Sequence, residues 1–242
     1  MTEKHLSSQF DNELAQLSSN LLAMGGLVEA QLRQALAALT HQSGEFAEAV
    51  LTDELRVNAM EIAIDDELTR IIARRQPAAV DLRLLLSIAR VTGNLERAGD
   101  EAAKIARMVR SIVNAGAVSL PLADLRLGCD LAAGLIAKSL DAFARLDTIA
   151  AFSTLKGDAD VDREFDGFVR KLITYMMEDP RTITQSLDLL FIAKAIERIG
   201  DHAKNIAECV IYVVKGADVR HRSLAETEAE IVGAMDSETG EP

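Results

Sequence analysis

Two segments of the chain carry the same pair of carboxylates at the same spacing. Glu96 and Asp100 lie four residues apart, as do Glu197 and Asp201, and an Arg and a Gly stand between the members of each pair. On a helix, positions i and i+4 share one face, where two carboxylates repel each other by a few tenths of a kcal/mol. A bound cation removes this repulsion, and carboxylate oxygens suit Mg²⁺, Mn²⁺, Ca²⁺ or oxidised iron. The first chemistry to consider is therefore cation binding.

A proline turn should bring further ligands to the first pair. Glu96 follows Pro77 by 19 residues, so Asn58, which precedes Pro77 by 19, is expected opposite it, and the same count places Glu54 opposite Asp100. Asn58 stands where a full carboxylate set would need an acid. The first predicted cation site therefore has three carboxylates instead of four.

The second pair is expected to have a fuller set of partners. Counted from Pro180, Glu197 faces the region of Asp162, and Asp201 faces the region of Asp158. Four carboxylates would then meet in a shallow, open site on the outside of a helical bundle. Without a cation such a cluster repels itself, and some of its members hold protons.

Other interpretations of these acids stay open. Glu61 and Asp65 form another i, i+4 pair, but the count places them about two turns too near Pro77, so they rank lower. The acids could also form only a solvated charged face, neutralised locally by basic neighbours. Those neighbours are Arg97, Lys104, Arg198 and Lys204.

No pattern in the sequence points to catalysis. A di-iron carboxylate bundle needs Glu-x-x-His pairs, and none of His5, His41, His202 or His221 has Glu three positions before it. His202, beside Asp201, is either a ligand or an ordinary surface residue. Phosphate-binding glycine loops and nucleophile motifs are absent, and Met24-Gly25-Gly26 is interpreted as a kink or a close helix crossing. We expect no enzyme.

Composition narrows the class of protein. Hydrophobic residues make up 49% and aromatic residues 4%, which favours close-packed helices over sheets. The net charge of −12 argues against direct binding of nucleic acid or anionic lipid. No secretory signal or membrane-spanning run is recognised, and Cys129 and Cys209 are interpreted as buried free thiols of the cytoplasm.

Breaks at prolines, glycines and capping residues divide the chain into long helices. We expect six, at 8–40, 44–76, 77–114, 121–146, 148–179 and 180–215. The third and sixth carry apolar stripes that superpose at a constant offset of 101 residues, from Leu95 and Ile196 to Ile112 and Val213, and the acidic pairs keep this offset. The predicted fold is all-α, with two tandem three-helix bundles at 1–116 and 117–216 and an acidic, mobile tail at 217–242, with or without a short helix.

With these features in place, the chain resembles the PhoU family of bacterial phosphate-uptake regulators over residues 8–216. The resemblance rests on Arg74-Arg75-Gln76-Pro77, Asp81-Leu82-Arg83, Tyr175 to Pro180, and the doubled Glu-Arg-x-Gly-Asp at 96–100 and 197–201.

The resemblance implies a homodimer with metal clusters on Glu96/Asp100, Glu197/Asp201 and Asp158/Asp162, for which Mg, Mn, Ca, Fe and Zn are candidates. It also implies repression of the phosphate-starvation (Pho) regulon and restraint of phosphate uptake. The partners would be the ATPase subunit of the phosphate ABC transporter and a phosphate-sensing histidine kinase, with contact to the membrane only through them. A metal-storage bundle or metal-dependent hydrolase is the alternative.

Overall fold

The computed structural model describes residues 8–115 and 121–239, which form seven α-helices and two short 3₁₀ turns, with no strand in these ranges. The α-helices are α1 (Ser8–His41), α2 (Gly44–Arg75), α3 (Ala79–Ala115), α4 (Leu125–Arg145), α5 (Thr148–Glu178), α6 (Ile183–Lys215) and α7 (Leu224–Thr239). The first six confirm the predicted helices to within a few residues. The expected boundary at 116–117 and the N-terminal residues Met1 to His5 lie outside the described residues.

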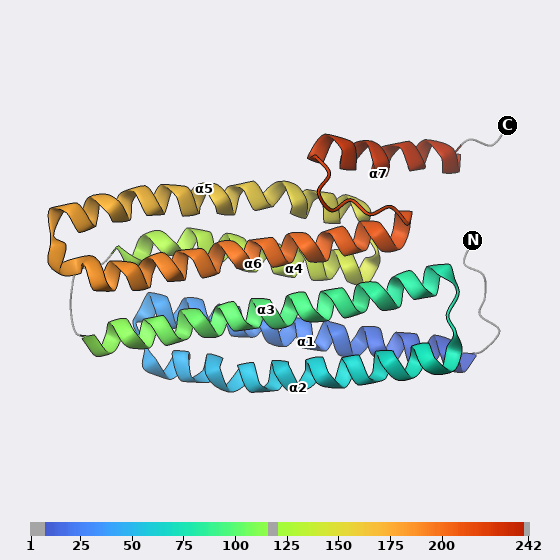
Figure 1. Cartoon of the computed structure of the whole chain (residues 1–242), viewed down its shortest axis with the longest axis horizontal. Coiled ribbons are helices and arrows are strands. Elements are labelled where there is room, and N and C mark those ends of the chain that lie inside the picture. Colours follow the sequence, from blue (N-terminus) through green and yellow to red (C-terminus); the bar gives the residue numbers. More distant parts are fainter. Residues whose placement is uncertain (1–7, 116–120, 240–242) are drawn as a thin grey trace.

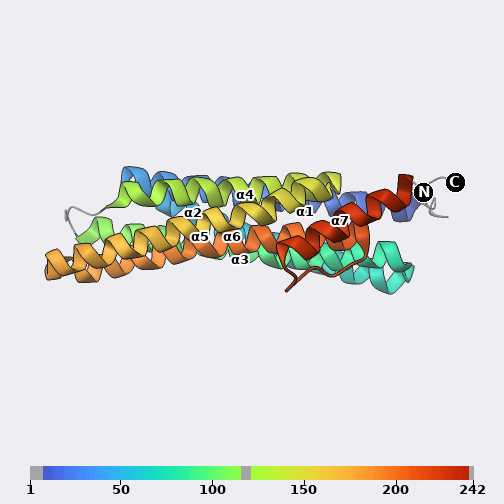
Figure 2. The same cartoon turned by 90° about the horizontal axis from the view of Figure 1, so that it is seen from above.

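The helices form two antiparallel bundles that pack along one another (Figure 1). Helices α1, α2 and α3 contact each other, as do α4, α5 and α6. The bundles meet mainly through α3 and α6, which lie side by side in the middle with α2 and α5 on the outside (Figure 1). Helices α1 and α4 also contact each other, and Figure 2 shows that they lie behind the α3–α6 pair of Figure 1. The all-α prediction with an internal repeat is confirmed.

The apolar stripes form the core of both bundles. Every stripe residue from Ile88 to Ile112 on α3 and from Ile192 to Val213 on α6 is buried. Three-four spacing places these side chains on one face of each helix, and that face is removed from water. Because Glu96 and Asp100 are out of phase with the stripe, the same packing turns them toward the outside.

Local signals set several helix ends and crossings. The Asp147 carboxylate accepts hydrogen bonds from the amides of Ile149 and Ala150, which caps α5, and Gly216 ends α6 at φ 70°. A Cβ on Gly25 would lie 2.7 Å from a Leu140 methyl group, so this glycine marks a close crossing of α1 with α4.

The segment after α6 returns along the second bundle. Helix α7 contacts α5 and α6, and Val219, Thr227 and Ile231 are buried. The helix is longer than the short one expected within the tail. Cys129 and Cys209 are buried free thiols, as predicted, and burial raises the pKa of each to about 12. A candidate membrane-spanning helix is not found within residues 8–115 or 121–239.

Candidate functional site

The four acids predicted for the second half share one electrostatic neighbourhood, here called the second carboxylate group: Asp158, Asp162, Glu197 and Asp201. Burial raises the pKa of Asp201, and the carboxylates of Glu197, Asp158 and Asp162 raise it further. The pKa of Asp162 is raised by burial and then by Asp158 and Glu197. The hairpin count from Pro180 thus located these residues correctly.

A lysine partly neutralises this group. The Lys204 ammonium donates a 3.1 Å hydrogen bond to Asp158, the buried member of the group. The Asp158 carboxylate also packs on Gly200, where a Cβ would lie 3.3 Å from its Oδ1. Glycine at position 200 therefore leaves room for the buried Asp158 carboxylate from α5. This contact explains why glycine is present although it stabilises a helix less than alanine does.

The first half differs from the sequence-based count. Burial raises the pKa of Glu96, followed by Asp100 and Glu61, and Glu54 contributes less. Burial likewise raises the pKa of Glu61, with Asp65 and Asp100 adding to it. The low rank given to Glu61 was therefore wrong. We call Glu61, Glu96 and Asp100 the first carboxylate group.

Glu54 and Asn58, the two residues predicted on α2, lie at the margin of the first carboxylate group. The Glu54 carboxylate accepts a 3.3 Å hydrogen bond from Arg107, about two helical turns beyond the first carboxylate group. The Oδ1 atom of Asn58 is buried without a hydrogen-bond partner. On α3, Gly99 packs against Val57, at 3.5 Å from the position of a Cβ, which shows that the α2–α3 count erred by only about two residues.

The donor chemistry of both groups fits a hard cation. All charged donors are carboxylates, and the raised pKa values of Glu96 and Asp201 reflect burial and like-charge repulsion that a cation would relieve. In the described part of the chain, no three Asp, Glu, His or Cys side chains converge closely enough to hold a metal ion. A cation would need side-chain rotation to complete its ligand set.

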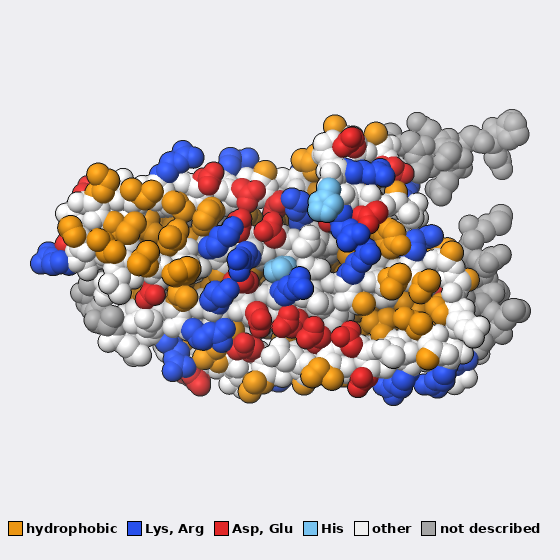
Figure 3. Space-filling view, viewed as in Figure 1, with side chains coloured by type: hydrophobic (Ala, Val, Ile, Leu, Met, Phe, Trp, Pro, Cys, Tyr) orange, Lys and Arg blue, Asp and Glu red, His pale blue; other side chains and the backbone are white. Residues whose placement is uncertain are grey.

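Between the two groups lies a basic groove that the sequence did not predict. Figure 3 shows two clusters of acidic side chains on one face, separated by Lys, Arg and His. The groove has a volume of about 660 Å³. It is lined by Arg97, Asp100, Glu101, Arg198, Asp201, His202, Lys204, Asn205, Glu208, Arg220, His221 and Arg222.

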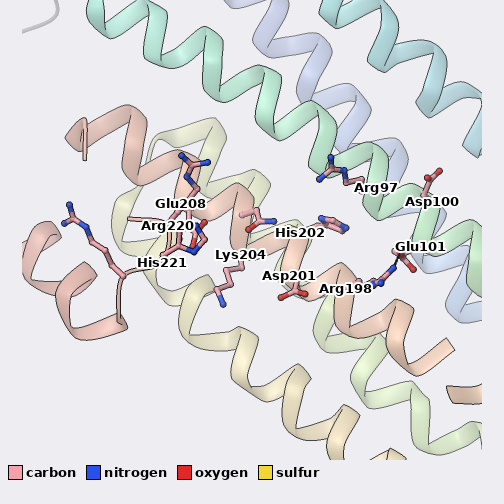
Figure 4. A pocket seen from close by; sticks show the side chains of 12 residues that line it. Arg97, Asp100, Glu101, Arg198, Asp201, His202, Lys204, Glu208, Arg220 and His221 are labelled. Carbon is pink, nitrogen blue, oxygen red and sulfur yellow. Dashed lines mark hydrogen bonds and ion pairs between the residues drawn. The ribbon is translucent and has the colours of Figure 1, made fainter. Parts of the chain in front are cut away.

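Three elements supply the basic side chains of the groove. Arg97 comes from α3, Arg198 and Lys204 from α6, and Arg220 from the segment after α6 (Figure 4). Arg97 and Arg198 occupy equivalent positions of the repeat, so the pairing of α3 with α6 brings them to the same groove. The sequence feature that could have indicated this groove is the run of basic residues from Arg220 to Arg222.

His202 is held at the contact between the bundles. Its Nδ1 lies 3.1 Å from the Oδ1 of Asn94, which also accepts a hydrogen bond from Asn205. Because this amide oxygen only accepts, Nδ1 carries the proton. Burial, with a smaller contribution from the nearby Arg97 and Arg198, lowers the pKa of His202 to about 4 against the opposing effect of Glu101. The ring is neutral at pH 7.

Comparison with known proteins agrees with the repeat. The PhoU domain model matches residues 21–109 and 125–210, one copy in each bundle. The chain is 46% identical over 229 residues to the phosphate-specific transport system accessory protein PhoU homolog of Pseudomonas putida, covering 95% of this chain and 90% of that protein. Against the PhoU accessory protein of Escherichia coli (strain K12), identity is 44% over 218 residues, with 90% of each chain covered.

Solved structures show the same architecture. The crystal structure of PhoU from Pseudomonas aeruginosa matches with a TM-score of 0.84 at 45% identity, covering 86% of this chain and all of that one. The regulatory protein PhoU from Streptococcus pneumoniae matches with a TM-score of 0.80 at 29% identity, covering 87% and 99%. With its doubled domain, its relatives and its fold in agreement, the chain belongs to the PhoU family.

Proposed function

We propose that this protein is a cytoplasmic negative regulator of phosphate uptake and of the phosphate-starvation regulon. It acts as a non-enzymatic adaptor between the ATPase subunit of the phosphate ABC transporter and a phosphate-sensing histidine kinase. The observation that carries the proposal is the PhoU domain in both bundles, together with relatives named as accessory proteins of the phosphate-specific transport system.

The surface supports an adaptor because it offers two apolar patches. At the α2–α3 turn the exposed side chains are Val80, Leu82 and Leu86, and at the α5–α6 turn they are Met177, Ile183, Leu187 and Phe191. Apolar side chains gather toward both ends of the face that carries the groove (Figure 3). Exposed apolar patches commonly mark protein interaction sites, and an adaptor needs two.

The repeat relates the two patches to each other. Leu82 corresponds to Ile183 and Leu86 to Leu187 at the 101-residue offset. The patches are therefore equivalent in place but different in content, since Phe191 replaces Arg90. We assign one patch to each partner. The protein reaches the membrane only through these partners, and it forms a homodimer.

Cations have a structural part in this proposal. The first and second carboxylate groups would hold Mg²⁺, Mn²⁺, Ca²⁺, iron or Zn²⁺, with Asn58 and Glu54 at the margin of the first. A bound cation would cancel the like-charge repulsion between α2 and α3 and between α5 and α6, and would stiffen the face on which the partners dock.

A gene deletion tests the regulatory function. Cells that lack this protein should express alkaline phosphatase at high phosphate, and the wild-type gene supplied in trans should restore repression. Normal repression in a clean deletion would contradict the proposal. A phosphatase activity of the purified protein that is lost in Asp201→Ala would instead support the metal-dependent hydrolase.

A further inference from the structure

The basic groove between α3 and α6 has a charge arrangement that the adaptor function does not explain. Side chains from three separate elements line it (Figure 4), and the positive groups lie between two acidic clusters (Figure 3). The lining is mixed, with five Lys or Arg side chains and four Asp or Glu side chains facing the same groove.

The acids that line the groove are partly neutralised by basic neighbours. Glu101 binds both Lys104, at 2.7 Å, and Arg198, at 3.1 Å. Asp100 and Asp201 belong to the first and second carboxylate groups. Burial raises the pKa of Glu208 despite the nearby Lys204 and Arg220, which lower it.

The basic side chains keep unused donor capacity. Arg198, Lys204, Arg220 and Arg222 each pair with one acid yet keep 40 to 51% of the side chain exposed. Within the described residues, Arg97 makes no ion pair, although it lines the same groove. Each guanidinium has five N–H donors, so one carboxylate partner leaves several of them free.

We propose that this groove binds a compact multivalent oxyanion, with a phosphate group as the fitting chemistry. Arg97 and Arg198 would hold it from the two repeats, and Arg220 from the segment after α6. Planar guanidinium groups bind tetrahedral oxyanions through paired hydrogen bonds, which explains arginine at these positions. The proposal stands on the groove itself and does not require the adaptor function.

The surroundings of the groove select for a small ligand. The carboxylate groups on both flanks repel any anion that extends past the groove. A nucleic-acid backbone or an anionic membrane would meet these acids, whereas a single phosphate or pyrophosphate fits within about 660 Å³.

Calorimetric titration tests the proposal on the full-length, chelator-treated protein at constant ionic strength. Inorganic phosphate and pyrophosphate should both bind saturably, and pyrophosphate more tightly. Arg97→Gln and Arg220→Gln should each weaken binding by about tenfold. Arg126→Gln is the matched control, because Arg126 is exposed on α4 and lies 3.8 Å from Asp130, and it should leave binding unchanged.

Thermal unfolding of each variant confirms that it is folded. Absence of saturable binding to either anion would overturn the proposal. So would wild-type affinity in the folded Arg97→Gln/Arg220→Gln double variant, or binding that appears only after a divalent metal is added. Because binding is measured on the purified protein, a negative result leaves the gene-deletion test of the adaptor function unaffected.

Discussion

The ammonium group of Lys204 lies 3.1 Å from the carboxylate of Asp158, the buried member of the second carboxylate group. Asp158 comes from α5 and Lys204 from α6, so this ion pair joins the two helices at the acidic group. Lys204 provides part of the positive charge that a cation would otherwise supply. It would therefore compete with a cation for Asp158.

Substitution of Lys204 should show whether it competes with a cation for Asp158. In chelator, we expect Lys204→Met to lower the free energy of unfolding by about 1 to 2 kcal/mol, because a buried carboxylate loses its partner. Mn²⁺ should raise the Tm of the variant more than that of the wild type. Lys171→Met is the control, since Lys171 pairs with Asp124 at an exposed position and should cost little. A Tm equal to wild type in chelator would contradict this assignment.

The second carboxylate group should give a pH-dependent response to cations. The folded-state pKa values of Asp162 and Asp201 lie above their ordinary values, so the folded state holds protons there more tightly than the unfolded chain. Their contribution to stability is therefore present at low pH and lost as pH rises through the raised pKa values. The rise in Tm caused by Mn²⁺ should be largest at neutral pH and shrink on acidification.

The variant Asp201→Asn separates the like-charge repulsion within the second carboxylate group from the binding of a cation. Asp201→Asn should raise the Tm in chelator by removing a like charge, and it should reduce the Mn²⁺-induced rise. Asp141→Asn is the control, because Asp141 pairs with Arg145 on the exposed face of α4. Elemental analysis of protein purified without chelator supplies a second readout. An unchanged Mn²⁺ response in Asp201→Asn would contradict the cation site.

Two adjacent glycines on α1 should respond in opposite directions. A Cβ on Gly25 would lie 2.7 Å from Leu140, whereas a Cβ on Gly26 has no such neighbour within 4 Å. Gly26→Ala should stabilise the protein by about 0.5 to 1 kcal/mol through helix propensity. Gly25→Ala should destabilise it by about 1 to 3 kcal/mol, because the packed Leu140 side chain must shift to admit the new methyl group. Chemical denaturation measures both, and equal effects would contradict the close crossing.

The repeat explains why much of the fold was predictable. The stripe residues of α3 and α6 follow a spacing that only a helix buries on one face, and the offset of 101 residues identified the duplication. Proline and capping residues located the turns. Helix α7 was underestimated, because its sequence after Glu226 is acidic and its few buried contacts, at Thr227 and Ile231, form no long stripe.

The site was less predictable because it depends on the exact axial register of α2 against α3. Glu54 and Glu61 are seven residues apart and share one face of α2, so the register alone decides which of them approaches Glu96. Counting from Pro77 gave this register to within about two residues, which was not accurate enough to place Glu61 beside Glu96. The basic groove was missed because Arg97 and Arg220 lie far apart in sequence and meet only when the two bundles pack together.

The two apolar patches should bind different partners. We expect Met177→Glu with Phe191→Glu to abolish binding of one partner and spare the other, and Val80→Glu with Leu82→Glu to do the reverse. The mutated side chains are exposed, so the fold should tolerate the charges. Leu127→Glu, at an exposed position on α4, is the control. Loss of both partners from one pair of substitutions would contradict separate docking surfaces.

The most direct test of the adaptor is whether both partners bind one molecule at the same time. The purified protein would be mixed with the transporter ATPase subunit and the cytosolic part of the histidine kinase, and the complexes would be separated by analytical ultracentrifugation. The account predicts a complex that contains all three proteins. Displacement of one partner by the other, or binding of neither, would contradict it.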